Sequence, residues 1–132
     1  MKIVIDATNA ALGRLASYSA KQLLFGKEVF IVNCNEAIVA GRPASIVEEF
    51  HKDRVRRSSS QRGPFYPKSP ERIMKRTVRG MLPYKQERGR KALKNLRCYN
   101  SIPIELKDEK KILAGKEKKT KTITLRQLSE KI

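Results

Sequence analysis

Positive charge is crowded into the middle of this 132-residue chain, and the crowding constrains its fold and partners more than any other feature. Residues 52–97, called the basic segment below, carry sixteen lysines and arginines against three acidic residues. Residues 1–51 carry five of each kind and are formally neutral. Because self-repulsion weakens a compact fold, such a segment indicates a polyanionic partner, and nucleic acid is the obvious class.

Length and composition predict one domain in three parts: a neutral scaffold in residues 1–51, the basic segment, and a return strand with a tail in residues 98–132. The two cysteines, Cys34 and Cys98, stand in no CxxC motif. They predict buried free thiols in a reducing compartment, with a disulfide or metal role as the alternative. No apolar run approaches the roughly 20 residues that span a bilayer, so we expect a soluble intracellular protein without a secretory signal.

The scaffold reads as alternating strands and helices. Residues 2–6, 29–32 and 37–40 contain apolar runs without polar alternation, the first being Ile3-Val4-Ile5, and they predict buried strands. Between them, Thr8 or Asn9 is expected to cap a helix that Gly26 closes, and a further helix is expected over residues 43–55. Unalternating strands separated by a helix favour a parallel sheet covered on both faces, which is an α/β fold.

The basic segment predicts a loop followed by two helices. Residues 58–64 hold turn residues and nothing to bury, so we expect a loop that is mobile when free, and the wider Arg54–Lys68 loop is expected to order only on binding. Ser69 is expected to cap a helix that Pro83 ends, and a second helix is expected over residues 87–96.

The end of the chain is expected to contribute less. Strand character returns over residues 98–104, and residues 105–121 mix both charge signs as solvated surface. Thr124 and Gln127 form a potential capping box for a last helix. Three apolar side chains of that helix are expected to dock on the body: Leu125, Leu128 and Ile132.

Both basic helices are predicted to have two distinct faces. At about 100° per residue, Arg72, Arg76 and Arg79 share one face of the first helix. Met74, Val78 and Met81 fall on the opposite face. The next helix repeats the spacing with Arg90, Lys94 and Arg97, while Ala92, Leu93 and Leu96 cluster elsewhere. The alternative is an ordinary solvated helix face, on which bases alternate with acids that pair with them one turn away. Such acids are missing here, so we favour binding of a polyanion.

We therefore expect the contacts to phosphate to come from the loop and both helices, with arginine forks matching phosphate oxygens. The candidate binding residues are Arg54, Arg56, Arg57, Arg62, Lys68, Arg72, Lys75, Arg76, Arg79, Lys85, Arg88, Arg90, Lys91, Lys94 and Arg97. Aromatic side chains among them either stack on unpaired bases or pack their loops against the body: Phe65, Tyr66 and Tyr84. Three glycines permit close approach to a phosphate chain or serve turn geometry: Gly63, Gly80 and Gly89.

Enzymatic signals are poor. The turn over residues 6–14 follows a strand and opens a helix, but it has neither GxxxxGK[ST] nor GxGxxG. His51 is the only histidine and has no cysteine or acidic cluster at ligand spacing. We expect no catalytic residue, no metal, no cofactor and no small-molecule substrate.

Several short motifs form a distinctive set between about residue 2 and residue 104. They are Asp6-Ala7, Leu12-Gly13-Arg14-Leu15-Ala16, Gly26, Gly63-Pro64-Phe65, Ser69-Pro70, Arg76-Thr77-Val78-Arg79-Gly80-Met81-Leu82-Pro83, and Arg88-Gly89 with Ala92-Leu93. Together they resemble the signature of the ribosomal large-subunit protein 13 family, in its archaeal and eukaryotic form.

The resemblance implies a three-layer α/β/α fold with a four-stranded, mostly parallel sheet. It also implies a structural constituent of the large ribosomal subunit that binds large-subunit rRNA and assists assembly. Neighbouring large-subunit ribosomal proteins would be its other partners, in cytoplasmic ribosomes.

Three rival classes remain at this point. An enzyme acting on nucleic acid would need a catalytic constellation or a cofactor loop. A DNA-binding regulator would need a recognition helix that mixes Asn, Gln and Arg, normally within a dimer. A membrane-surface helix would need bulkier apolar faces than these helices have, so we expect no membrane partner.

Overall fold

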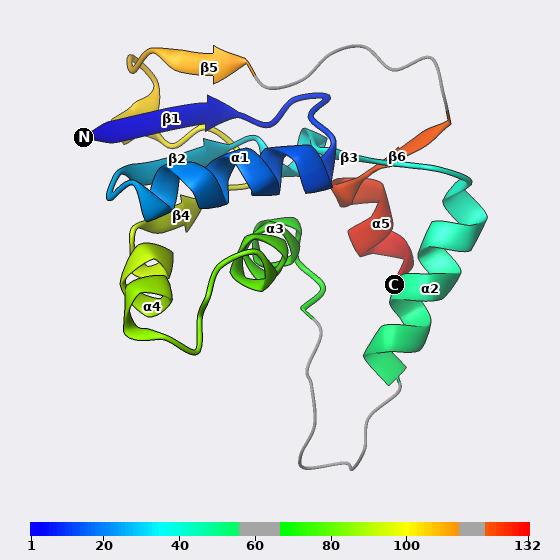
Figure 1. The fold of residues 1–132 in the computed structure, drawn as a ribbon. Coiled ribbons are helices and arrows are strands. Elements are labelled where there is room, and N and C mark those ends of the chain that lie inside the picture. The colour runs from blue at the N-terminus through cyan, green and yellow to red at the C-terminus, as the bar shows by residue number, and fades with distance from the viewer. Residues whose placement is uncertain (56–66, 114–120) are drawn as a thin grey trace.

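The structure is a computed structural model that describes residues 1–55, 67–113 and 121–132 (Figure 1). Its centre is a four-stranded sheet in the order β4-β2-β1-β5, in which every pairing is parallel. The strands are β1 (Lys2–Asp6), β2 (Glu28–Val32), β4 (Leu96–Cys98) and β5 (Lys111–Leu113). The predicted α/β class and the four-stranded parallel sheet are confirmed.

Right-handed crossovers decide which face of the sheet each connection covers. From β1 to β2 to β4 the chain steps in one direction, so α1 (Leu12–Leu24), α3 (Pro70–Gly80) and α4 (Glu87–Lys94) lie together on one face (Figure 1). From β4 the chain returns across the other face to reach β5. The one-turn 3₁₀ helix η2 (Ile104–Leu106) lies in that return.

Alternation along the strands builds one core on each face of the sheet. Ile5 and Ile31 join the larger core with the inner residues of α1, α3 and α4. Val4 and Val32 are the strand neighbours of Ile5 and Ile31, so their side chains point to the opposite face of the sheet and pack against Leu106 of η2. Runs such as Ile3-Val4-Ile5 are apolar throughout because both sides of these strands are covered.

A second, two-stranded sheet accounts for the run at residues 37–40. Its strand β3 (Ile38–Ala40) pairs antiparallel with β6 (Thr122–Thr124) and stands outside the main sheet. We expected this run to join the parallel sheet, and that expectation was wrong. The hydrophobic pattern of a strand indicates only that the strand is buried. It does not identify the pairing partner, which here lies more than 80 residues away in the sequence.

The C-terminal part contributes more than sequence patterns indicated. Residues 105–121 were expected to be solvated surface, yet Leu106 is buried and β5 forms an edge of the main sheet. The strand predicted over residues 98–104 was also wrong, because β4 ends at Cys98. An edge strand needs a partner on one side only and tolerates flanking lysines, so its sequence looks like surface.

Of the two remaining helices, one packs against the second sheet and the other packs against that helix. Helix α2 (Pro43–Val55) begins at the predicted proline, with Ile46 buried and Phe50 packed against the main core. Helix α5 (Leu125–Lys131) has the predicted capping box, in which the Thr124 hydroxyl accepts a hydrogen bond from the Gln127 amide at 3.2 Å. Its apolar residues dock as expected: Leu125 and Leu128 are buried and Ile132 packs on the core.

The start of α1 differs from its prediction. Neither Thr8 nor Asn9 caps the helix, because Ala11 occupies the N-cap position. Thr8 instead donates two hydrogen bonds to the Asp6 carboxylate, at 3.0 and 2.7 Å, and Asn33 donates a third at 3.1 Å. Burial opposes ionisation of Asp6, but these hydrogen bonds outweigh it and hold its pKa below the usual value.

The two cysteines lie close together without a disulfide. Both are free thiols, Cys34 buried and Cys98 half-buried, which agrees with the prediction from sequence except for the partial exposure of Cys98. A hydrogen bond with the Cys98 thiol and burial together raise the pKa of Cys34 well above its usual value. Cys34 therefore stays protonated and poorly nucleophilic.

The N-terminus of α4 packs tightly because residue 89 lacks a side chain. A Cβ built at Gly89 would overlap the Pro83 carbonyl. We expect Gly89→Ala to lower the free energy of unfolding by about 1–3 kcal/mol through overpacking. The matched control is Gly13→Ala in α1, where an added Cβ meets no heavy atom within 4 Å. Helix propensity should make that change stabilising by up to about 1 kcal/mol. Urea unfolding measures both, and equal effects would contradict this packing.

Two helix caps that look alike in sequence are expected to respond differently to mutation. Thr124 caps α5 through its hydroxyl, whereas Ser69 precedes α3 without a side-chain capping bond. We expect Thr124→Ala to lower the free energy of unfolding by about 1 kcal/mol, and Ser69→Ala to change it by less than about 0.5 kcal/mol. Thermal or chemical denaturation of the two single variants measures this difference. A larger loss from Ser69→Ala would show that this capping assignment is wrong.

Candidate nucleic-acid interface

Helix α3 separates its apolar and basic residues onto opposite faces. Ile73, Met74 and Val78 are buried against the main core. Arg72 and Lys75 are exposed, and Arg76 and Arg79 are half-exposed. The predicted two-faced helix is confirmed with one exception, because Met81 is 44% exposed. The helix ends at Gly80, so Met81 no longer follows its periodicity.

The start of α3 is held by a residue from a distant part of the chain. Pro70 occupies the first turn, as predicted, and the Ser69 carbonyl accepts hydrogen bonds from the Arg72 and Ile73 amides at 3.1 and 2.9 Å. The Glu71 amide donates to Asn100 Oδ1 at 3.1 Å. Sequence reasoning missed Asn100, and no local signal marks it, since it lies 29 residues after Glu71.

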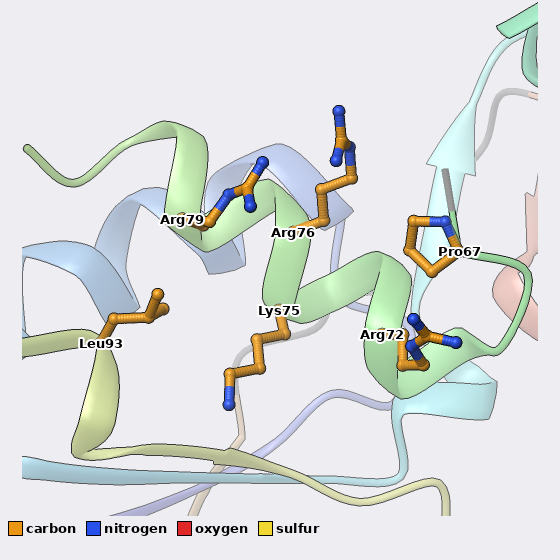
Figure 2. A pocket seen from close by; sticks show the side chains of 6 residues that line it. All are labelled: Pro67, Arg72, Lys75, Arg76, Arg79 and Leu93. Carbon is orange, nitrogen blue, oxygen red and sulfur yellow. The ribbon is translucent and has the colours of Figure 1, made fainter. Parts of the chain in front are cut away.

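Basic side chains line an open groove of about 310 Å³ beside α3, called the α3 groove below. Its lining residues are Pro67, Arg72, Lys75, Arg76, Arg79 and Leu93 (Figure 2). In this view Arg76 and Arg79 extend to one side of the helix and Lys75 to the other. Four cations thus surround one concave surface. Like charges this close repel each other, and several phosphate groups of a polyanion would neutralise them.

An aromatic ring orients Arg79. Its guanidinium carbon lies 4.9 Å from the centre of the Tyr84 ring, within cation–π range. The Nε atom of Arg79 is buried and has no hydrogen-bond partner among the described residues. The turn after α3 therefore presents this guanidinium group in a defined position. Of the two roles open to Tyr84, packing against its own segment is the one seen here.

The turn after α3 and helix α4 extend the basic surface. Five predicted residues are exposed here: Lys85, Arg88, Arg90, Lys91 and Lys94. Lys91 pairs with Glu87 at 3.3 Å, one helical turn away. Such an exposed pair contributes at most a few tenths of a kcal/mol, so it leaves Lys91 accessible to a stronger anion. The buried side of α4 is formed by Gly89 and Ala92.

Arg97 does not share a face with Arg90 and Lys94, so that prediction was wrong. Helix α4 ends at Lys94, and Arg97 lies in β4 beside Phe30 of β2. Its strand neighbours Leu96 and Cys98 point into the main core, so alternation directs Arg97 to the opposite face of the sheet. The spacing of 100° per residue applies only within the helix, so it does not predict the direction of a residue that follows the end of α4. Arg97 is exposed on the side of η2, away from the α3 groove.

The remaining predicted residues fall in or near the preceding loop. Lys68 is exposed just before α3, and Arg54 belongs to the last turn of α2. Several predictions lie outside the described residues: the loop of residues 58–64, and Arg56, Arg57, Arg62, Gly63, Phe65 and Tyr66. Of the other two glycines, Gly89 serves packing, and Gly80 has open space around it.

Residues considered for enzymatic chemistry have structural explanations. The Asp6 carboxylate accepts the hydrogen bonds that fix its turn, and His51 is exposed on α2. Over the ranges that the structure describes, no group of three or more His, Cys, Asp or Glu side chains could hold a metal ion. No helix within those ranges is long and apolar enough to cross a membrane.

The contact between Arg79 and Tyr84 yields a measurable coupling. We expect Arg79→Met and Tyr84→Leu, combined in a double-mutant cycle, to show a coupling free energy of about 0.5–1 kcal/mol in urea unfolding. The control cycle replaces Arg79→Met by Arg72→Met, roughly 10 Å further along the helix, and should be additive. If the changes in the free energy of unfolding were additive in both cycles, Tyr84 would not stabilise the position of Arg79.

Comparison with known proteins supports the resemblance seen in the sequence. The family described as "Ribosomal protein L13" matches residues 1–105. Similar proteins named "Large ribosomal subunit protein uL13" come from archaea. That of Methanosarcina barkeri is 51% identical over 110 residues, covering 83% of this chain and 78% of its own. That of Archaeoglobus fulgidus is 42% identical over 132 residues, covering 96% and 84%.

A third relative, from Thermoplasma volcanium, is 44% identical over 107 residues and covers 81% of this chain and 78% of its own. The match to Archaeoglobus extends through the C-terminal residues, where β5, β6 and α5 complete the fold. Identity at this level over most of both chains shows common descent. This chain belongs to the ribosomal protein L13 family.

Proposed function

We propose that this chain binds large-subunit rRNA through α3, the turn after it and α4, and that this binding assists assembly of the particle. Membership of the ribosomal protein L13 family makes it a structural constituent of the large ribosomal subunit, acting in translation. Its working location is then the cytoplasmic ribosome, where neighbouring ribosomal proteins are further partners.

One observation carries the proposal: over residues 67–97, most bases are exposed while most of the aliphatic residues between them are buried. Residues 67–97 hold eleven lysines and arginines and two acidic residues, and nine of these eleven bases are exposed. A protein that gained only stability from these helices would have no use for such a charge excess, which opposes folding. Phosphate groups supply the missing negative charge.

The form of this surface favours recognition of a folded RNA backbone over reading of base sequence. Its polar groups are nearly all cations, which bind phosphate, and α3 and α4 lack the mixture of Asn, Gln and Arg that reads base edges. The α3 groove gathers guanidinium groups at one concave place, as two-point contacts to phosphate require. We infer that RNA shape and phosphate spacing determine the fit.

The same proposal extends to residues that sequence alone assigns. Arg54 lies in the last turn of α2, Arg56, Arg57 and Arg62 follow it in the sequence, and Lys68 comes just before α3. Arg97 is a separate contact in the proposal because it faces the other side of the sheet. A division into a neutral scaffold, the basic segment and a C-terminal part follows from this placement of charge.

Salt dependence of binding tests the electrostatic basis of the proposal. If about eight phosphates are engaged, the logarithm of the association constant for large-subunit rRNA should fall with the logarithm of salt concentration at a slope of about −6 to −7. Filter binding from low to moderate salt measures the slope. A nearly flat dependence would contradict binding through phosphate.

A charge-matched pair of variants tests the location. We expect the combination of Arg72→Ala, Lys75→Ala and Arg76→Ala to reduce the magnitude of the slope by about 2–3 and to leave thermal stability unchanged or raised. The control removes three exposed lysines outside the basic segment: Lys107, Lys110 and Lys131. Equal losses in both variants would indicate general charge attraction. Stronger binding to duplex DNA than to rRNA would favour a DNA-binding protein.

A further inference from the structure

Helix α1 carries a row of alternating basic and aromatic residues on its outer face, although it belongs to the neutral scaffold. The row consists of Arg14, Tyr18, Lys21 and Phe25 and is called the α1 stripe below. These residues are spaced at i, i+4, i+7 and i+11, so they fall within about 60° of one another around the helix. Phe25 is the residue that directly follows the last turn.

The α1 stripe lies directly opposite the buried face of the helix. Leu12, Leu15, Ala16, Ser19, Ala20 and Leu23 are buried. The two aromatic rings are instead accessible: Tyr18 is 41% and Phe25 is 65% exposed. Arg14 and Lys21 are exposed as well. Core formation explains the buried residues of α1 but not the exposed parts of these two rings.

The charge around these rings has one sign. Helix α1 contains no acidic residue, and its two charged side chains are Arg14 and Lys21. Each aromatic ring is therefore preceded on the same face by a cation one turn earlier in the chain. An acid at position 17 or 18 would pair with both bases from one turn away, but these positions hold Ser17 and Tyr18.

We propose that the α1 stripe is a second RNA-binding surface, on which Tyr18 and Phe25 stack against unpaired bases while Arg14 and Lys21 contact the adjoining phosphates. Stacking on aromatic faces beside a basic track is how proteins bind single-stranded RNA without strong sequence preference. The surface thus differs in ligand from the α3 groove, which fits folded phosphate backbone.

Other occupants fit the observations less well. A second copy of this chain would bring another net charge of +17 against a basic surface, so self-association is opposed. A protein partner would need an acidic surface with room for two aromatic rings, and nothing in the structure specifies one. RNA supplies both aromatic bases and negative charge in one chain.

The position of α1 allows both surfaces to contact one RNA. Helix α1 packs against α3 and α4 on the same face of the sheet (Figure 1). A folded RNA held by the basic segment can then place an unpaired stretch on the α1 stripe. The inference is separable from the function proposed above, since no residue of the α1 stripe belongs to the basic segment.

The first test removes the aromatic faces and keeps the apolar bodies. Tyr18→Leu with Phe25→Leu, in the full chain, should weaken binding of a single-stranded oligouridine by about 25-fold, taking the lower end of the range for each stacked base. Binding of an RNA duplex of equal length should be unchanged. The control is Leu24→Ala, which removes a 44% exposed apolar side chain beside the stripe. Unchanged oligouridine affinity in the folded double variant would overturn the inference.

The second test gives a direct signal of stacking. The chain contains no tryptophan, so Phe25→Trp places a single tryptophan in the α1 stripe and Leu24→Trp places one next to it, and either can be excited selectively over the tyrosines. We expect single-stranded RNA to quench the emission of the first variant strongly and that of the second weakly. Equal or absent quenching at saturating RNA would overturn the inference. The inference would also be overturned if the variant with Tyr18→Leu and Phe25→Leu bound RNA normally but no longer bound an acidic ribosomal protein.

Discussion

Burial of the apolar faces of α3 and α4 against α1 and the sheet is the constraint on which the rest of this structure depends. Ile73, Met74 and Val78 are buried, and each such side chain contributes roughly 1.5–3 kcal/mol. Repulsion between like charges one turn apart on a helix amounts to about 0.2–0.5 kcal/mol per pair. Burial therefore outweighs repulsion, and the helices hold their cations close together before any RNA arrives.

The direction of the chain through the sheet then determines where those cations lie. Because β1, β2 and β4 follow one another in the same direction, right-handed crossovers place α1, α3 and α4 on one face. Both basic helices consequently lie on one side of the main sheet, and η2 lies on the other side. Preorganisation of this kind reduces the ordering that binding would otherwise require.

Local patterns in the sequence predicted most of the fold and the two-faced character of α3. They succeeded wherever the cause is local, as in the proline start of α2 and the Thr124 capping box. They failed where the partner is distant in sequence. Strand β3 pairs with β6, β5 joins an edge, and Asn100 holds the start of α3, and none of these contacts leaves a mark in the neighbouring residues.

The predicted binding residues divide in the same way. Lys75 and Arg88 were predicted from charge density alone, and they are accessible because their helices present them to solvent. Arg97 was placed on the wrong surface because a helical spacing was extended into a strand. The net charge of residues 1–51 gave no indication of the α1 stripe, since the acids that balance Arg14 and Lys21 lie elsewhere in the scaffold. A segment with no net charge can still have one basic face.

We propose that rRNA neutralises the cations of α3 and α4 in the assembled large subunit. Crosslinking the protein to RNA in native particles, followed by sequencing of the RNA and mapping of the crosslinked peptides, tests this neutralisation most directly. We expect peptides from residues 67–97 to carry fragments of large-subunit rRNA. A protein that sediments apart from ribosomes and carries no RNA would contradict the proposal.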